Sequence, residues 1–262
     1  MVVTEGLNPH FTSDERFLAA CSTVRHHYPL PTTHYPLFFY GSGCGSADQR
    51  ARVVSLLSKA FGTSDIHVET DMLGACRAVR GDKAGMVGIL GTGSNACYYD
   101  GEKIVCQPFS MGYILGDEGS ANHVGRQLLQ DYLSDKMGSM LSARFHDDYP
   151  MTKAEFMDAV YHQPNANRFL ASLAPFALKY AEDKSYGDYL SSLILYCLDC
   201  WFTHQLGDLY WRYGCRWLSL VGGFAARIPE AVLQQFADIH GLSIDTVLAD
   251  PIDGLREYHT AN

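Results

Sequence analysis

Apolar residues in the first third of the chain alternate between short continuous runs and helical spacing. Residues 35–40 form an aromatic, strand-like run, and residues 47–61 then place apolar side chains at the three- and four-residue intervals of an amphipathic helix. The unit repeats, because residues 66–69 are strand-like, residues 71–79 are helix-like, and residues 84–90 are a glycine-interrupted apolar run typical of a buried parallel strand. This alternation predicts α/β architecture.

The middle of the chain departs from this alternation. Residues 96–99 and 103–107 are typical of two strands around an Asp-Gly hairpin turn. Helical spacing then dominates, and it predicts helices over 119–134, 152–162, 166–183 and 186–213. We therefore predict a large helical insertion over residues 119–213.

The α/β pattern returns near the C-terminus. Residues 217–221 predict a strand that leads into two consecutive glycines, and residues 225–240 predict the helix after them. Residues 243–248 predict a last strand, and Pro251 is a suitable first residue for a short terminal helix.

Composition narrows the possible partners and the compartment. The chain has 262 residues, enough for one large or two modest domains, and its 20 Lys and Arg against 29 Asp and Glu give a formal net charge of −9. Because the basic residues are scattered, we expect no nucleic-acid partner. We also expect no membrane partner, since the apolar stretch 189–202 is too short to span a bilayer. With no secretory signal and eight cysteines in mostly apolar contexts, we predict a cytoplasmic protein without structural disulfides.

Two glycine-rich turns are candidate phosphate sites. One holds Gly91, Thr92 and Gly93 after an apolar strand, and the other holds Gly222 and Gly223 between a strand and a helix. Glycine lets the backbone approach phosphate oxygens, and free N–H groups and the threonine hydroxyl supply donors. Neither turn completes a Walker A loop, so an ordinary turn is the alternative interpretation of each.

Two carboxylates are candidate catalytic or binding groups. Asp71 lies at a strand–helix junction, and Asp117 lies just before the long helical region. A carboxylate at the end of a strand can accept a substrate proton or bind sugar hydroxyl groups. Each residue would equally suit the N-terminus of a helix, so capping is the alternative for both.

Cys197, Cys200 and His204 share one helical face and, with Cys215 downstream, form the candidate metal set of the sequence. Their spacing resembles a zinc site, but they alternate with core-type leucines on a helix, where buried free cysteines are common. We therefore assign no metal ligand.

Six motifs, taken in order, cover nearly the whole chain: Gly6–Phe11, Glu69–Ala75, Gly91–Asn95, Gly112–Ser120, Val221–Phe224 and Pro251–His259. Together they resemble the BadF/BadG/BcrA/BcrD ATPase family, in its N-acetylglucosamine kinase-like branch of the actin, sugar-kinase and heat-shock chaperone superfamily. The resemblance implies two ribonuclease-H-like (actin-like ATPase) domains that close on a cleft, formed by residues 1–84 plus 250–262 and by residues 85–249.

The family's first phosphate loop, Asp-x-Gly-x-Thr-Lys on an N-terminal hairpin, has no counterpart in this sequence. We therefore expect an N-terminally truncated first domain whose sheet has an unpaired edge and an uncovered apolar face.

The resemblance further implies ATP-dependent phosphorylation of an amino sugar at its 6-hydroxyl, with Mg²⁺ and with Asp71 as the base. The residues that it assigns to the hexosamine are Asn8, Ser94, Asn95 and Asp117. The residues that it assigns to ATP are Gly91, Thr92, Gly93, Gly222 and Gly223. Kinases of this type are often homodimers.

Two other functions fit the same sequence. One is an ATPase activator of an acyl-CoA dehydratase, which would bridge a dimer with a cysteine-bound iron–sulfur cluster. The other is a sugar-binding paralogue or fragment that keeps the sugar-binding residues and has lost phosphate handling.

Overall fold

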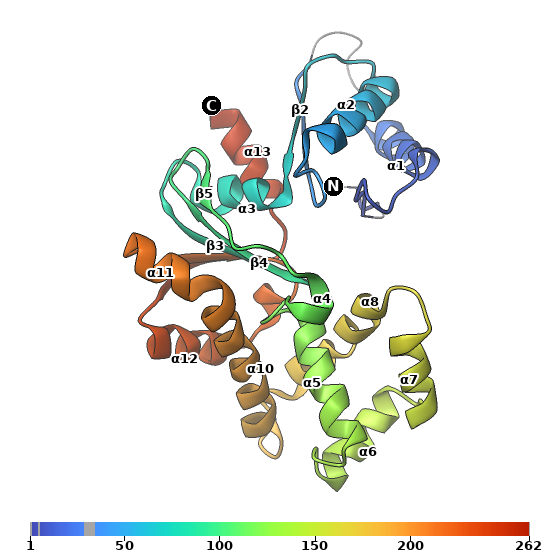
Figure 1. Ribbon diagram of the computed structural model, residues 1–262, viewed down its shortest axis with the longest axis vertical. Helices are drawn as coiled ribbons and strands as arrows, with labels where there is room; N and C mark the ends of the chain where they lie inside the picture. The colour runs from blue at the N-terminus through green and yellow to red at the C-terminus, as the bar shows by residue number, and fades with distance from the viewer. Residues whose placement is uncertain (1, 5, 29–34, 262) are drawn as a thin grey trace. The chain divides into compact units, whose positions relative to one another are not determined.

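The computed structural model describes residues 2–4, 6–28 and 35–261, and the chain forms two compact units, Met1–Gly74 and Ala75–Asn262 (Figure 1). The division falls inside helix α3 (Asp71–Arg80). The assignment of residues 75–84 and 250–262 to the first domain stays a prediction.

In its described residues, the first unit is a two-stranded parallel sheet with two helices. Its elements are α1 (Asp14–His27), β1 (Leu37–Gly41), α2 (Ala47–Phe61) and β2 (Ile66–Thr70). The register pairs Gly41 with Thr70, so both strands end at the same edge. The predicted strands and α2 are confirmed, whereas α1 was not predicted because its buried residues are only Phe17, Ala20 and Cys21.

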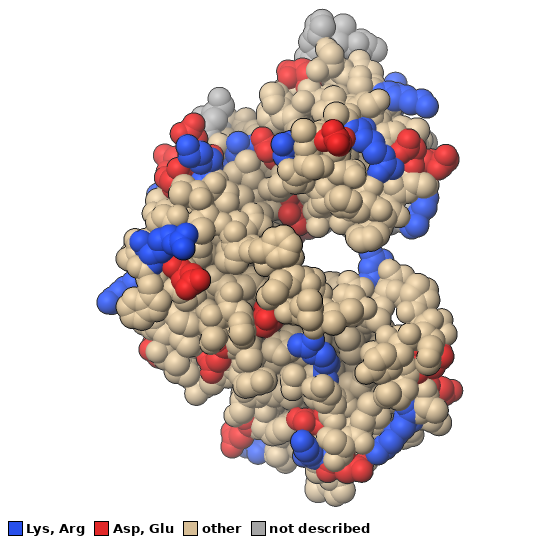
Figure 2. All heavy atoms as spheres, viewed as in Figure 1, with Lys and Arg blue, Asp and Glu red and all other residues tan. Residues whose placement is uncertain are grey.

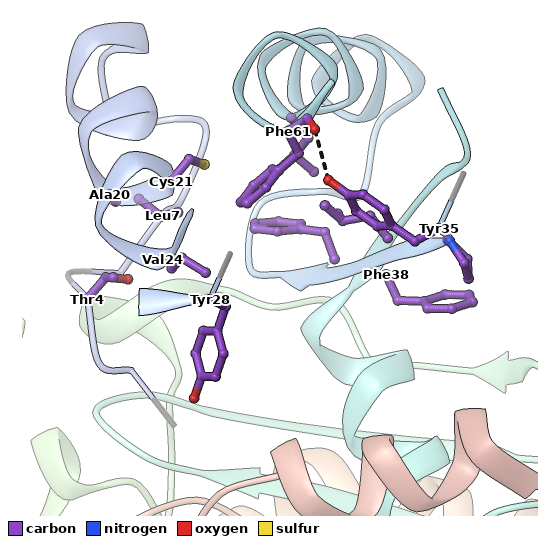
Figure 3. A pocket seen from close by; sticks show the side chains of 13 residues that line it. Thr4, Leu7, Ala20, Cys21, Val24, Tyr28, Tyr35, Phe38 and Phe61 are labelled. Carbon is purple, nitrogen blue, oxygen red and sulfur yellow. Dashed lines mark hydrogen bonds between the residues drawn. The ribbon is translucent and has the colours of Figure 1, made fainter. Parts of the chain in front are cut away.

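A cavity of about 410 Å³ lies in the first unit between α1, β1 and the end of α2 (Figure 3). Its walls are mostly apolar and include Ala20, Val24 and Leu37. Tyr35 closes one side, where its hydroxyl donates to the Phe61 carbonyl at 2.8 Å. Burial beside the cavity raises the pKa of the Cys21 thiol to about 11.

The second unit contains a five-stranded mixed sheet in the order β5-β4-β3-β6-β7. The strands are β3 (Gly85–Leu90), β4 (Ser94–Tyr99), β5 (Ile104–Cys106), β6 (Trp217–Val221) and β7 (Ser243–Leu248). β3, β6 and β7 run parallel, and β4 and β5 continue the sheet as an antiparallel hairpin. All five predicted strands are confirmed.

Helices make up most of the remainder of this unit. Those between β5 and β6 are α4 (Gly112–Leu115), α5 (Ala121–Leu133), α6 (Ser139–Asp148), α7 (Lys153–Tyr161), α8 (Ala166–Ala171), α9 (Ala174–Tyr180), α10 (Gly187–Trp201), the π-helix η1 (Phe202–Leu206) and α11 (Gly207–Tyr213). Those after β6 are the 3₁₀ helix η2 (Ala225–Arg227), α12 (Glu230–His240) and α13 (Ile252–Ala261). The helical insertion is thus confirmed.

Three helix predictions need correction. The helix predicted over 166–183 is two helices, because Pro175 lacks the N–H that would continue the first. The helix predicted over 225–240 is likewise divided, with α12 starting after Pro229. α6 was missed, and the predicted 186–213 helix contains a π turn. No helix among the described residues is long and apolar enough to cross a membrane.

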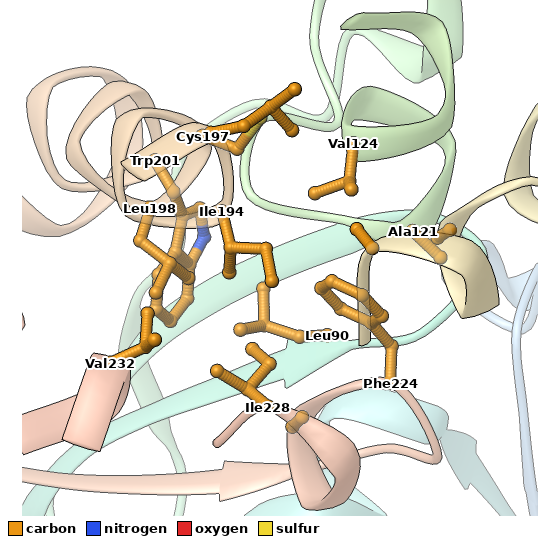
Figure 4. Packing of buried hydrophobic residues seen from close by; sticks show 14 of the residues in the cluster. Leu90, Ala121, Val124, Ile194, Cys197, Leu198, Trp201, Phe224, Ile228 and Val232 are labelled. Atoms are coloured by element: carbon orange, nitrogen blue, oxygen red, sulfur yellow. The ribbon is translucent and has the colours of Figure 1, made fainter. Parts of the chain in front are cut away.

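The core of the second unit lies between the sheet and the helices of the insertion. Trp201 is fully buried there beside Ile194 and Leu198 (Figure 4). Its ring covers Gly88 of β3, where an added Cβ would lie 2.3 Å from the indole. On the face of the unit seen in Figure 2, acidic and basic side chains are interspersed.

The terminal helix and α3 are joined to the sheet. Gly254 of α13 packs on the Ala78 carbonyl, so closely that an added Cβ would lie 2.4 Å from its oxygen. On α3, the buried Arg80 guanidinium pairs with Asp245 of β7 and donates to the Ser219 hydroxyl of β6 at 3.2 Å. This buried charge is compensated by its partners, which fixes α3 against two strands.

We expect Gly88→Ala to lower the free energy of unfolding by about 1–3 kcal/mol, because the methyl group would overpack the strand against Trp201. Urea denaturation measures the change. Gly223→Ala is the matched control, since an added Cβ at Gly223 meets no atom within 4 Å. Equal stability of the two variants would contradict the packing argument.

Candidate functional site

Asn8 and Asp71, two of the predicted site residues, lie near one turn of the first unit. That turn, Ser42–Gly43, follows β1 at the sheet edge where β2 also ends. The Ser42 side chain hydrogen-bonds to the Asp71 carboxylate. Gly43 has a φ of +84°, and an added Cβ would lie 2.5 Å from the Asn8 Oδ1, so the turn contacts both predicted residues.

The backbone around Asn8 is held by Arg52. The Asn8 carbonyl accepts hydrogen bonds from the N–H groups of Phe11 and Thr12, at 3.0 and 2.9 Å. Arg52, on α2, donates to the carbonyl of Pro9 and to that of Thr12. The asparagine is therefore placed by a structured turn.

Asp71 is the first residue of α3, but it is not the residue that caps the helix. The Thr70 hydroxyl accepts from the Leu73 N–H at 3.2 Å, which is the bond that an N-cap side chain makes. Burial raises the pKa of Asp71, against the lowering by hydrogen bonds from Met72 and Ser42. Thr70 therefore caps the helix in place of Asp71. The Asp71 carboxylate remains at the end of the strand, partly buried and with a raised pKa.

In the second unit, the turn Gly91–Gly93 is fixed through its carbonyl groups. The Gly91 N–H donates to the Gly93 carbonyl at 2.9 Å. The Gly91 carbonyl accepts from the Ala121 N–H at 3.0 Å, and the Thr92 carbonyl accepts from the Asn122 N–H at 3.2 Å. Because the start of α5 holds these carbonyls, the exposed Thr92 side chain is presented on a rigid turn.

Gly222 brings the second glycine turn against the first. β3 and β6 are parallel neighbours, paired up to Ile89 and Val221, so both turns leave the same sheet edge. Gly222 has a φ of +135°, and an added Cβ would lie 2.2 Å from the Leu90 carbonyl oxygen. Gly223 is exposed and has open space around it. The sequence predicted the start of a long helix at this turn, but the helix that follows it is the short 3₁₀ helix η2.

Asp117 also lies at the first glycine turn. Its Oδ1 accepts from the Ser94 N–H at 3.4 Å, and its Oδ2 accepts from the Asn122 side-chain amide at 3.3 Å. An added Cβ at Gly93 would lie 2.7 Å from Oδ2, so a side chain there would displace the carboxylate. Ser120 caps α5, by accepting from the His123 N–H, which again leaves the predicted acid without the capping role.

The backbone conformation and the charge of Asp117 both carry a cost. Its φ is 56°, in the left-handed region that non-glycine residues seldom adopt. Burial raises its pKa, against hydrogen bonds from Ser94 and Asn122 that lower it. A strained and partly desolvated carboxylate at a turn is typical of a functional position.

Ser94 and Asn95 begin β4 beside this turn. Ser94 is buried, and its hydroxyl accepts from the Gln205 side chain at 3.2 Å. Asn95 is half-buried, and its Oδ1 accepts from the Ala96 N–H at 2.9 Å. The second unit therefore brings together seven predicted residues, namely Gly91, Thr92, Gly93, Ser94, Asn95, Asp117 and Gly222, with Gly223 next in the chain.

Sequence reasoning missed the polar residues that support this group. Asn122 is fully buried, and its amide donates to the Thr92 carbonyl, to Asp117 and to Ser120. His123 is buried too, and its Nδ1 accepts from the Gly119 N–H at 3.2 Å. The sequence offered one signal for them: Asn122 and His123 are polar residues in the first turn of a helix that packs into the core.

The eight cysteines are free thiols, with the Cys76 and Cys97 Sγ atoms 3.3 Å apart. Of the zinc set considered from spacing, Cys197 is in the hydrophobic core and His204 is exposed (Figure 4). Within the described part of the chain, no group of three or more His, Cys, Asp or Glu side chains could hold a metal ion.

Comparison with solved structures identifies relatives. A crystal structure from Porphyromonas gingivalis, described as a "Putative N-acetylglucosamine Kinase", is 31% identical over 99% of this chain and 90% of that one, with a TM-score of 0.86. The chain belongs to the same family as this Porphyromonas protein. Comparison with protein-family models gives no match, and neither does comparison with curated proteins.

More distant structures share the fold of this family. A protein of the same description from Chromobacterium violaceum is 21% identical, over 93% of this chain and 83% of that one, with a TM-score of 0.62. The MamK filament protein is 12% identical, over 98% and 80% of the two chains, with a TM-score of 0.51. The predicted fold class, an α/β fold of the actin-like ATPase type, is thereby confirmed.

His123 makes stability depend on pH in a defined direction. Burial lowers its pKa from 6.5 to about 4. Below pH 6.5 the unfolded chain binds a proton that the folded chain does not accept until about pH 4, so stability is lost as the pH falls across this window. We expect a loss on the order of 3 kcal/mol from this residue.

Urea denaturation at a series of pH values tests this expectation. His123→Asn keeps an acceptor near the Gly119 N–H but cannot titrate, so its stability should fall less between pH 6.5 and 4 than that of the wild type. The control is His162→Asn, a change at an exposed histidine, and its stability should vary with pH as that of the wild type does. Parallel curves for all three proteins would refute the assignment.

Proposed function

We propose that this protein is an ATP-dependent sugar kinase that phosphorylates an amino sugar of the N-acetylglucosamine type at its 6-hydroxyl. Membership of the Porphyromonas protein's family, at 31% identity over 99% of the chain, is the observation that carries the proposal. The two glycine turns at the β3–β6 edge and the partly buried carboxylates support it by their chemistry.

ATP is assigned to the two glycine turns. Positions 91 and 223 have open space. The nearest atom to an added Cβ at Gly91 would be the Gly93 oxygen, 4.0 Å away, and a Cβ at Gly223 would meet no atom within 4 Å. Backbone at such positions lets phosphate oxygens come close. We assign the β- and γ-phosphates to Gly91, Thr92 and Gly93, and the adenosine to Gly222 and Gly223.

The chemistry needs little more than positioning and charge neutralisation, because phosphoryl transfer forms no covalent bond to the protein here. Asp71 accepts the proton of the attacking 6-hydroxyl, and the Ser42 hydrogen bond orients the carboxylate. Mg²⁺, when bound to the phosphates, would neutralise their charge, and it commonly needs only one or two protein carboxylates besides water.

The sugar is assigned to Asn8, Ser94, Asn95 and Asp117. Asp117 is suited to the sugar hydroxyls, because the Ser94 N–H and the Asn122 amide hold its carboxylate in place. An ionised carboxylate has further lone pairs that can accept hydrogen bonds from the sugar. Ser94 and Asn95 supply a hydroxyl and an amide beside it. Polar groups of both donor and acceptor type distinguish a sugar from an apolar ligand.

We expect Asp71→Asn to lower kcat about 10²- to 10⁴-fold, because the amide cannot accept the substrate proton. Sugar-dependent ADP release with Mg·ATP, measured across hexosamines and plain hexoses, is the assay. For the wild type, kcat/KM should fall as the pH drops through a pKa above 3.8, since the protonated carboxyl is no base.

Asp65→Asn is the matched control, because Asp65 is an exposed carboxylate of the same unit that pairs with His67. It should retain the wild-type rate. Turnover by Asp71→Asn within threefold of the wild type would remove Asp71 from the mechanism. Absence of ADP release with every sugar, from folded protein, would refute the kinase proposal itself.

A further inference from the structure

A π-helical turn interrupts the last long helix of the insertion next to the sugar-binding residues assigned above. η1 covers Phe202–Leu206, and it closes through a bond from the Gly207 N–H to the Phe202 carbonyl. An added Cβ at Gly207 would lie 3.1 Å from that carbonyl oxygen, so the turn is tightly closed. π turns within helices are rare and occur frequently at functional sites.

This turn presents the side chain of Gln205 to the site. The amide donates both of its N–H groups, and its oxygen accepts one hydrogen bond. Its Oε1 accepts from the Trp201 indole N–H at 3.3 Å. Its Nε2 donates to the Ser94 hydroxyl at 3.2 Å and to the Glu118 carboxylate at 3.1 Å. Ser94 and Glu118, both distant from Gln205 in sequence, therefore meet at its amide.

The contacts leave a single orientation for this amide. Turning it over would place its oxygen against the Glu118 carboxylate and its NH₂ group against the Trp201 N–H, which repel. Trp201 is itself fully buried. The amide NH₂ group is therefore held toward Ser94.

This orientation decides what the Ser94 hydroxyl can do. Ser94 is 7% exposed, and its oxygen already accepts the Gln205 proton. Among the described residues, no protein group accepts the proton of this hydroxyl. A serine whose oxygen is engaged as an acceptor can still donate, so its proton is available to an oxygen atom of a ligand.

We propose that Gln205 is a positioning residue for sugar binding: from the π turn, it sets the Ser94 hydroxyl as a donor to a sugar oxygen and holds Glu118 beside Asp117. The inference rests on the proposed function, because it takes the sugar to be the ligand at Ser94. Gln205 acts through Ser94 and Glu118, so its loss weakens sugar binding and leaves ATP binding and the proton transfer at Asp71 intact.

The test is Gln205→Met, which keeps the length of the side chain and removes the amide. The sugar Kd, measured by calorimetry without ATP, and the sugar KM should rise about tenfold, whereas the KM for ATP stays unchanged and kcat changes less than threefold. Gln234→Met is the matched control, since Gln234 is an exposed glutamine that also donates to a carboxylate, that of Asp238. It should leave all four constants unchanged.

A second pair of variants separates positioning from general destabilisation. Ser94→Ala should raise the sugar Kd by a similar factor, and the double variant should lose no more than either single variant, because both remove the same donor. Additive losses, or a fall in kcat at unchanged sugar Kd and KM, would overturn the proposal.

Failure of the inference and failure of the kinase proposal are distinguishable. Wild-type protein that binds sugar without releasing ADP would refute the kinase activity, and the Kd series would still decide the role of Gln205. Wild-type turnover with an unaffected sugar Kd in Gln205→Met would refute the positioning role alone. A wild-type protein that binds none of the sugars would overturn both.

Discussion

The close approach of β6 to β3 is the constraint on which the second unit's site depends. At the ends of these parallel strands, Gly222 passes so near the Leu90 carbonyl oxygen that an added Cβ would be 2.2 Å away. Only glycine adopts its φ of +135° without strain, so this contact is possible with that residue alone. Any larger residue would separate the two strands where both glycine turns leave the sheet, and the backbone of one turn would no longer lie beside that of the other.

The second constraint is the start of α5, which organises the same turns from the opposite side. Its first residues bond the Gly91 and Thr92 carbonyls, and Asn122 joins the Thr92 carbonyl to the Asp117 carboxylate. Each of these buried hydrogen bonds would be costly to break, although the Asn122 Oδ1 itself has no partner among the described residues. The turn, the carboxylate and the helix therefore form one rigid group, on which the strained φ of Asp117 can be maintained.

The sequence was sufficient for the strands and the turns, because these depend on local patterns. The predicted strands are confirmed, and the glycine turns lie where apolar runs end. Spacing could not decide whether Asp71 and Asp117 cap helices, since a neighbour can take that role, as Thr70 and Ser120 do. Gln205 was beyond reach for a different reason: it meets Ser94 across 111 positions of sequence, through a π turn whose extra residue no helical periodicity indicates.

The glycines of the site divide into two kinds, and the division separates structure from binding. At Gly119 and Gly222 an added Cβ would lie under 3.0 Å from Trp201 or the Leu90 carbonyl, so the protein's own packing requires these glycines. At Gly93 an added Cβ would displace the Asp117 carboxylate. At Gly91 and Gly223 the space is open. Nothing in the fold demands glycine there, since neither has a positive φ. At such an open position beside a rigid turn, atoms of a ligand can take the place that a side chain would otherwise occupy, and this is the geometric argument for the proposed ligand at these turns.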